Sequence, residues 1–262
     1  METSLVQGCW LLLLAVIVPD AAAVIVCPVL PQQQGPARSC ADLQWAGATE
    51  SGIYSIEVDG KSVSVYCDMD IDGGGWTVVQ RRVDGQEDFV NRLFADFADG
   101  FGSADGDHWL GLETVHQMTW LHPSELFVSL QDCAGDNASA LYRTFAIGPS
   151  ATDYTLTVGG YTADPIVGLP DAMDYSNQRK FSAADRDNDD AEDHGCAVST
   201  QCAWWMVDCF HSCLNGPYHS DCSTPVNWLG IMWYLWKDAV GDYSAKTSLM
   251  MTRPLDYGCT PD

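Results

Sequence analysis

The chain has 262 residues, of which 12 are Lys or Arg and 36 are Asp or Glu, so its formal net charge is −24 at pH 7. So acidic a protein repels polyanions, which excludes nucleic acid and anionic membrane surfaces as partners and favours a cation such as calcium. Hydrophobic residues make up 47% and charged residues 18%, a balance that excludes an intrinsically disordered chain.

The N-terminus has the pattern of a secretory leader. An apolar run of ten residues, Cys9 to Val18, is followed by a proline, an aspartate and three alanines, which is a small-residue cleavage context. The run is too short to span a bilayer, so no membrane insertion is expected. The segment before it carries Glu2 and no Lys or Arg, and an uncleaved buried segment is the alternative. We predict a signal peptide at 1–23, a linker at 24–37 and a secreted, extracellular protein.

Eleven cysteines are present, and Cys9 would leave with the leader. Ten cysteines in an exported chain indicate disulfide bonds, whose pairing does not follow from counting. Zinc is the alternative, but the spacings lack the short paired knuckles of a zinc site, and oxidising export disfavours free thiolates. A link to a second chain is also open for Cys27, Cys133 and Cys259. The ten are Cys27, Cys40, Cys67, Cys133, Cys196, Cys202, Cys209, Cys213, Cys222 and Cys259.

Short strand patterns dominate the first half of the domain. Residues 53–66 alternate apolar and polar side chains around Asp59-Gly60, a pair typical of tight hairpin turns, and predict two antiparallel strands. Three glycines at 73–75 permit positive φ before a strand-like segment at 77–82, although a wide turn is the alternative. Further candidates are a partly helical segment at 84–117 and strands at 125–131, 141–147 and 154–158. This succession favours an antiparallel sheet.

One N-glycosylation sequon, Asn137-Ala138-Ser139, lies among turn-forming residues. An asparagine in this motif accepts a glycan when it lies on the surface of a secreted protein. We therefore predict glycosylation at Asn137.

The pattern becomes irregular beyond Gly159, where Asp, Gly, Asn, Pro and Cys dominate for about seventy residues. The acidic residues of the chain comprise 29 Asp and 7 Glu, and Asp favours turns and caps over helix interiors. Irregular stretches of this length in compact domains usually carry function. Disulfides, together with a bound metal, would have to hold this stretch together because it lacks a periodic apolar face.

The densest charge lies in an acidic loop at residues 185–195. Calcium takes six to eight oxygen ligands at about 2.3–2.6 Å, from carboxylates, backbone carbonyls and water. Alternate positions of an extended loop can converge on one ion, and Asp187, Asp189 and Asp193, with the carbonyl of Ala191, fit that geometry. The positions that an EF-hand reserves for glycine and glutamate carry other residues, so that motif is excluded. We predict Ca2+ as the cofactor, with a solvated acidic loop as the alternative.

Residues 204–216 read Trp-Trp-Met-Val-Asp-Cys-Phe-His-Ser-Cys-Leu-Asn-Gly. This closely resembles the Trp-Trp-x3-Cys-x5-Asn-Gly signature of fibrinogen C-terminal domains, which occur in ficolins, tachylectins, angiopoietins, tenascins and fibrinogen chains. Matching motifs follow one another in order at residues 40–43, 52–54, 66–69, 73–82, 181–182, 230–233 and 236–237. The resemblance covers roughly residues 38 to 255, and we place the domain at 38–262.

The resemblance implies an α+β fold with a small N-terminal part, a central antiparallel sheet, short helices and a loop-rich calcium-binding C-terminal subdomain. It also implies the disulfides Cys40–Cys67 and Cys196–Cys209. The family's calcium ligands fall on Asp187, Asp189 and the backbone at Ala191 and Asp193. This chain has one residue more before Cys196 than many relatives, so Asp190 is an alternative ligand.

Similarity to the lectin-like members implies a ligand pocket beside the calcium, with a cis peptide at Asp208-Cys209. An acetyl group needs an aromatic cup for its methyl and a backbone N–H for its carbonyl oxygen. Phe210 stands where many acetyl-binding relatives carry His, and Thr200 where several carry an aromatic residue, so mere packing of the pocket wall is the alternative. The predicted pocket residues are Thr200, Asp208, Cys209, Phe210, His211, Asn227 and Trp228.

These features predict a secreted calcium-dependent lectin of ficolin or tachylectin type that binds glycans or acetylated groups on cell surfaces in innate immunity. Single sugar sites bind weakly, so a homo-oligomer is expected to supply avidity. The alternative is an extracellular protein-binding, matrix or signalling module without sugar binding. An enzyme is not expected, because the six histidines are scattered and no Ser-His-Asp arrangement is present.

Overall fold

A computed structural model describes residues 35–120, 122–163, 168–192, 194–224, 228–238 and 243–255. The predicted signal peptide and most of the predicted linker lie outside these residues, and so do Asp193, Asn227, Cys27 and Cys259. Within the described ranges, no helix is long and apolar enough to cross a membrane.

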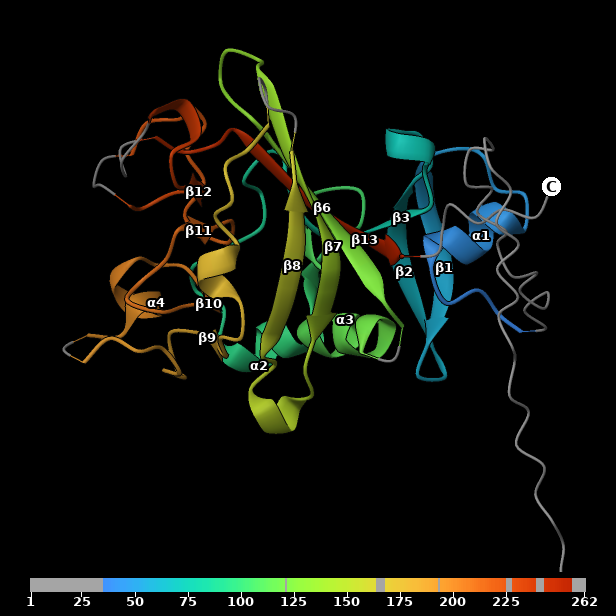
Figure 1. The fold of residues 1–262 in the computed structure, drawn as a ribbon, viewed down its shortest axis with the longest axis horizontal. Helices are drawn as coiled ribbons and strands as arrows, with labels where there is room; N and C mark the ends of the chain where they lie inside the picture. Colours follow the sequence, from blue (N-terminus) through green and yellow to red (C-terminus); the bar gives the residue numbers. More distant parts are fainter. Residues whose placement is uncertain are drawn as a thin grey trace, which may run out of the picture.

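A nine-stranded antiparallel sheet forms the centre of the molecule (Figure 1). Its strand order is β1-β2-β3-β13-β6-β7-β8, with β5 paired to β3 and β4 paired to β5. The predicted α+β class with a central antiparallel sheet is confirmed. The strands are β1 Gly52–Val58, β2 Lys61–Asp68, β3 Trp76–Arg82, β4 Phe101–Gly102, β5 His108–Trp109, β6 Ser124–Gln131, β7 Asn137–Ile147, β8 Leu156–Thr162 and β13 Thr247–Pro254.

The predicted hairpin forms β1 and β2, with Asp59 and Gly60 in the turn between them. Both turn residues have positive φ, 49° and 71°, as a tight two-residue turn requires. Alternation of side chains then places Ile56, Val58 and Val65 in the core. The glycines at 73–75 also have positive φ, and Gly74 approaches the backbone of Met69 so closely that a Cβ there would clash.

The last strand, β13, lies in the middle of the sheet between β3 and β6. Ser248 is opposite Arg82 on one side and Leu130 on the other. The sequence analysis did not predict this strand. Its place depends on pairing with segments more than a hundred residues away in the chain, which local patterns do not report.

The described helices are short, as the excess of Asp over Glu predicts. Helix α1 begins with a capping box, in which the Ser39 hydroxyl accepts a bond from the N–H of Asp42 and the Asp42 carboxylate accepts one from the N–H of Ser39. The α-helices are α1 Cys40–Trp45, α2 Phe94–Asp99, α3 Leu112–Thr119 and α4 Cys196–Ser199, and the 3₁₀ turns are Ile71–Gly73, Ser150–Thr152, Asp174–Ser176 and Trp236–Asp238.

An aromatic core joins the sheet to the C-terminal part. Phe181 lies 5.3 Å from Phe97 of α2 and 5.2 Å from Trp205, ring centre to ring centre, and Trp109 lies 6.3 Å from Trp205. All four side chains are buried. The tryptophan pair of the family signature is therefore core, and the Trp205 indole N–H donates to the carbonyl of Tyr154 at 2.8 Å.

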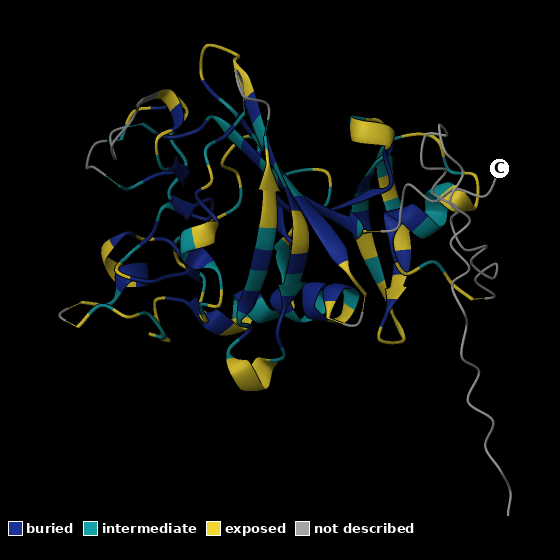
Figure 2. Ribbon diagram, viewed as in Figure 1, coloured by how far each residue is buried: buried dark blue, intermediate teal, exposed yellow. Residues whose placement is uncertain are grey.

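The C-terminal subdomain is built mostly from loops, drawn in orange and red in Figure 1. Two small sheets brace it, β9 (Phe181–Ser182) with β10 (Trp204–Trp205) and β11 (Ser212–Cys213) with β12 (Met232–Trp233). Two buried side chains of β3 fix it to the central sheet: the Gln80 amide donates to the carbonyl of Leu214 and the Arg82 guanidinium to that of Gly216, both at 2.9 Å. Buried positions follow these strands into the loops (Figure 2).

Disulfide bonding, predicted from the cysteine count, is confirmed by four bonds among the described residues. Two are the pairs that the resemblance implies, Cys40–Cys67 and Cys196–Cys209. The other two are Cys133–Cys222 and Cys202–Cys213, whose pairing the sequence left open. Cys133 is thus bonded within its own chain and is no candidate for a link to a second chain.

Candidate functional site

The acidic loop folds back between β9 and α4 around two of its predicted metal ligands. The Asp189 carboxylate accepts backbone bonds from the N–H of Ala191 at 3.0 Å and from the N–H of Cys196 at 2.7 Å. Asp187 in turn accepts a bond from the N–H of Asp189 at 3.2 Å. Gly195 passes so near that a Cβ there would lie 3.2 Å from the Asp187 carboxylate. The loop therefore closes over this pair of carboxylates.

The two carboxylates interact electrostatically. Burial raises the pKa of Asp189, and the adjacent Asp187 raises this pKa further, while the two backbone N–H bonds act in the opposite direction. Two like charges held together in a partly buried position favour the binding of a cation between them.

The alternate residues of the loop point elsewhere. The Asp190 carboxylate forms an ion pair with Arg179 at 2.6 Å, and the Asp185 carboxylate accepts a bond from the N–H of Phe94 at 2.7 Å. The amide of Asn188 donates to the carbonyl at residue 181, at 2.7 Å. Asn188 and Asp190 thus point away from the Asp187–Asp189 pair, as the predicted alternation requires, whereas Asp185, which has the same parity as the predicted ligands, is bonded to Phe94 instead. Asp190 is poorly suited as an alternative calcium ligand, because its carboxylate is already paired with the Arg179 guanidinium.

The predicted calcium ligands fit a hard cation as far as they are described. Asp187 and Asp189 would contribute carboxylate oxygens, and Ala191, whose N–H donates to Asp189, would contribute its carbonyl. Asp193 lies outside the described residues. An all-oxygen donor set of this kind suits Ca2+ rather than a soft metal.

A second cluster of ligand-type side chains lies next to the loop. The ligand atoms of His194, Cys196, Asp208 and Cys209 lie within 4.8 Å of one another. Both sulfurs are joined in a disulfide, so neither is a thiolate that binds zinc. The bond instead ties the start of α4 to the turn at Asp208-Cys209, whose peptide is cis, as the resemblance implies.

Two predicted pocket residues are buried and make their contacts within the domain. Thr200 is 9% exposed, and its hydroxyl donates to the carbonyl of Cys196 at 2.6 Å. Phe210 is 8% exposed and packs edge-on against Trp228 with ring centres 6.0 Å apart. Both observations agree with the packing interpretation of these positions.

His211 and Trp228 belong to a partly exposed aromatic cluster, which we define as Tyr175, His211, Trp228 and Tyr234. His211 stacks between Tyr175 and Tyr234, with ring centres 4.0 and 4.8 Å away. Tyr234 is in turn stacked near Trp228 at 6.4 Å. The N–H of Tyr234 donates to the carbonyl of His211 at 2.7 Å, which fixes the two segments side by side.

Tyr175 and Tyr234 were not predicted from the sequence. They lie on segments separated from His211 by thirty-six and twenty-three residues, and no local spacing links them. Leu235, 51% exposed, extends the apolar surface beyond Tyr234. Asn227, also predicted for the pocket, lies outside the described residues. The cluster thus gathers two of the seven predicted pocket residues and adds two that were not predicted.

The fold and its site define a fibrinogen-type globular domain. The family model for the C-terminal globular domain of fibrinogen beta and gamma chains matches residues 36–255, and the chain belongs to this family. Human angiopoietin-related protein 6 is 37% identical over 230 residues, which cover 87% of this chain and 47% of that protein. Rat tenascin-R is 40% identical over 203 residues, which cover 76% of this chain and 14% of that protein.

Solved structures show the same likeness. The fibrinogen-like globe domain of human ANGPTL6 has a TM-score of 0.79 and 36% identity, over 88% of this chain and 99% of that one. A lamprey fibrin D-dimer, in complex with the peptide Gly-His-Arg-Pro-amide, has a TM-score of 0.75 and 28% identity, over 84% and 74%. The chain spans about half the length, or less, of the curated relatives that it matches.

These similarities correct the predicted function. Angiopoietin-related proteins, angiopoietins and tenascin-R, named above or equally similar, are extracellular signalling and matrix proteins, so the prediction of a lectin for glycans or acetylated groups is wrong and the alternative is favoured. The predicted role in innate immunity depended on the lectin prediction and is not supported either. The chain is not an enzyme, as predicted, because the family is non-enzymatic. The calcium ligands and the glycosylation of Asn137 stay predictions.

Proposed function

We propose that this domain is a secreted, extracellular protein-binding module of the signalling or matrix type, and that the aromatic cluster is its contact surface. Angiopoietins and tenascin-R among the relatives, the leader-like N-terminus and four disulfides support this proposal. The observation that carries it is the partly exposed stack of Tyr175, His211, Tyr234 and Trp228.

Stacked aromatic side chains suit a protein partner. Tyr and Trp offer large, rigid contact areas with a polar end, and they are enriched at the centres of protein interfaces. Both faces of the His211 ring are covered by tyrosine rings, so the stack offers one continuous aromatic surface. Leu235 adds exposed apolar area at its edge.

The charge of the chain favours a basic partner surface. The net charge of −24 attracts cationic proteins and accelerates their association. An arginine or lysine of the partner can stack on a tyrosine or tryptophan face and gain about 0.5–2 kcal/mol. The lamprey fibrin neighbour, whose ligand is the arginine-containing peptide Gly-His-Arg-Pro-amide, supports a ligand of this chemical class.

A calcium ion would serve this surface structurally. Asp187 and Asp189 would supply carboxylate oxygens, with the carbonyl of Ala191 and the residue Asp193 as further ligands. The ion would neutralise the facing carboxylates and hold the loop that is bonded through Cys196 to the turn at Cys209. That turn leads directly into Phe210 and His211.

A binding screen tests the proposal. The secreted chain, in calcium, is applied to an array of recombinant extracellular receptor and matrix domains, each present in native and enzymatically deglycosylated form. We expect binding to at least one domain that survives deglycosylation and excess free N-acetylglucosamine. Binding only to the glycan-bearing forms, with full competition by the free sugar, would overturn the proposal.

A further inference from the structure

The four described disulfides differ in how far they are exposed. Cys40, Cys67, Cys196 and Cys213 are 0% exposed and Cys202 is 2% exposed, while Cys209 is partly buried. Cys133 alone among the eight bonded cysteines is exposed, and its partner Cys222 is 3% exposed. A thiolate from solution therefore reaches Cys133 more readily than any of the other seven sulfurs.

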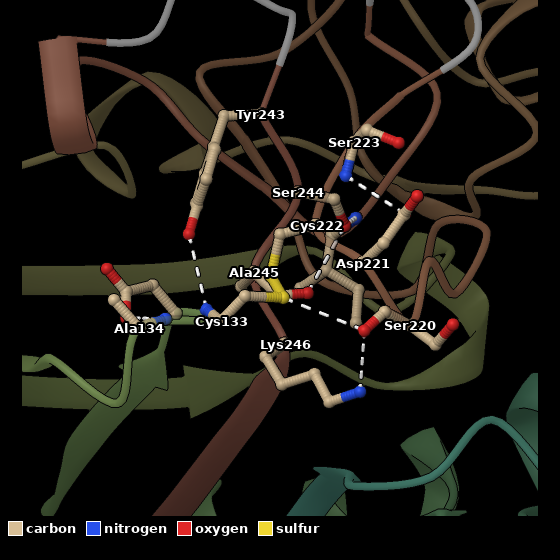
Figure 3. The surroundings of a disulfide bond; sticks show 12 residues. Cys133, Ala134, Ser220, Asp221, Cys222, Ser223, Tyr243, Ser244, Ala245 and Lys246 are labelled. Carbon is tan, nitrogen blue, oxygen red and sulfur yellow. Dashed lines mark hydrogen bonds between the residues drawn. A yellow bond between two sulfur atoms is a disulfide. The ribbon is translucent and has the colours of Figure 1, made fainter.

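A positive charge lies beside this bond. The Cys133 sulfur is 3.6 Å from the carbonyl oxygen of Ser220, and the Lys246 ammonium donates to the same oxygen at 2.7 Å (Figure 3). The N–H of Cys133 donates to the Tyr243 hydroxyl at 3.4 Å. The Lys246 ammonium thus shares the Ser220 carbonyl with the Cys133 sulfur, and a positive charge near a cysteine favours its thiolate, which here is the Cys133 thiolate released in the second exchange step.

The bond fastens the described parts of the C-terminal stretch, 218–224, 228–238 and 243–246, to the turn at 132–136 between β6 and β7. In the described residues the turn is also held by Lys237, which pairs with Asp132 at 2.7 Å and Asp136 at 2.6 Å, and by the N–H of Lys246, which donates to the carbonyl of Gln131 at 2.8 Å. The stretch around Tyr234 is held separately, by the pairing of β12 with β11 and by the bond from the Tyr234 N–H to His211. The Lys237 pairs are partly open to solvent, so salt weakens them. The fastened segment carries Trp228 and Tyr234 of the aromatic cluster.

We propose that Cys133–Cys222 is a thiol-exchange site for a dithiol reductant, and that opening it loosens the segment that presents Trp228 and Tyr234. One thiolate of the dithiol attacks the Cys133 sulfur, and Cys222 leaves as a thiolate. The second thiol of the dithiol then displaces Cys133 from the mixed disulfide. The dithiol supplies both electrons and becomes a disulfide, and the two cysteine thiolates each take up one proton.

Timed reduction of the native chain tests the first half of the proposal. The protein in calcium is exposed to limiting dithiothreitol, quenched with iodoacetamide and mapped by mass spectrometry. We expect Cys133 and Cys222 to be labelled at least about tenfold faster than the other six cysteines, and Lys246→Met to slow that labelling severalfold. Equal rates for all four bonds, or first labelling at Cys196 and Cys209, would refute the site.

Hydrogen exchange tests the second half. The singly opened, alkylated protein and the Cys133→Ser/Cys222→Ser variant are compared with the intact chain. Amides at 228–235 should exchange about tenfold faster in both opened forms, while those of β1 and β2 keep their rates. Unchanged exchange at 228–235 would show that the bond fastens nothing. This readout reports the mobility of the segment directly, so it is independent of which partner the aromatic cluster binds.

Discussion

Asp189 and Asp190 are neighbours in the chain with opposite surroundings. Asp189 is turned into the loop, where two backbone N–H groups bind its carboxylate and Asp187 lies beside it. Asp190 is turned outward onto Arg179, and both of these side chains are exposed. The same residue type is therefore the predicted metal ligand at one position and forms a weak surface ion pair at the next.

This difference predicts unequal effects on calcium binding. Asp189→Ala removes a ligand oxygen and the anchor of Cys196, so we expect calcium affinity to fall at least about tenfold in calorimetric titration. Asp190→Ala is the matched control and should change the affinity by no more than about twofold. Equal losses in the two variants would indicate a diffuse acidic loop rather than a site.

His108 predicts how the fold responds to acid. Burial lowers its pKa to about 4, and the nearby Arg81 guanidinium acts in the same direction. Because this folded value is below the unfolded one, the stabilisation is present above about pH 6.5 and is lost as the pH falls towards 4. His108 should therefore account for about 2–3 kcal/mol of the free energy of unfolding lost between pH 7.5 and 4.5.

Urea unfolding across this pH range measures the loss. His108→Gln, which does not titrate, should flatten the pH dependence by that amount, whatever its effect on absolute stability. The exposed His122→Gln is the control and should leave the wild-type slope in place. An unchanged slope in His108→Gln would assign the acid sensitivity to other groups.

At the scale of elements, the chain that leaves β11 and the chain that enters β12 meet at a close backbone approach in the C-terminal subdomain. A Cβ on Gly216 would lie 2.0 Å from the carbonyl oxygen of Gly230. Gly216 ends the Asn-Gly pair of the family signature, and Asn215 is 0% exposed with its amide donating to the carbonyl of Ala203 at 3.1 Å. The signature glycine is therefore needed for the approach of β11 to the segment that enters β12.

Gly216→Ala should force these segments apart and reduce the free energy of unfolding by about 1–3 kcal/mol. Gly159→Ala in β8 is the matched control, because no atom lies within 4 Å of the added methyl group and the glycine has no positive φ. We expect that control to stay within about 0.5 kcal/mol of wild type in chemical unfolding. Similar stability of the two variants would contradict the close approach.

Local sequence patterns predicted those elements whose structure depends on residues close to them in the chain. The turn at Asp59-Gly60 fixed β1 and β2 because a two-residue turn sets the register by itself. The strand β13 escaped prediction because its partners, β3 and β6, are distant in sequence. The same limit applied to the bonds Cys133–Cys222 and Cys202–Cys213, which only the folded chain brings together.

At the scale of the whole molecule, the signature at 204–216 was enough to predict the family, since its tryptophans, cysteine and glycine each have a packing role that few other residues can fill. The ligand was not predictable in the same way. A shared fold does not by itself specify a ligand, and Tyr175 and Tyr234, which complete the aromatic cluster, carry no local signal in the sequence. The lectin prediction was wrong because it inferred the ligand from the shared fold.

The most direct test of a protein-binding aromatic cluster is the affinity of variants for whichever deglycosylated domain the wild-type chain binds. Tyr234→Ala and Trp228→Ala should each raise the dissociation constant at least about tenfold, whereas Trp120→Ala, at an aromatic side chain that is 52% exposed beyond the end of α3, should leave it within about twofold. Wild-type affinity in both cluster variants, with loss in Trp120→Ala, would place the contact surface elsewhere on the molecule.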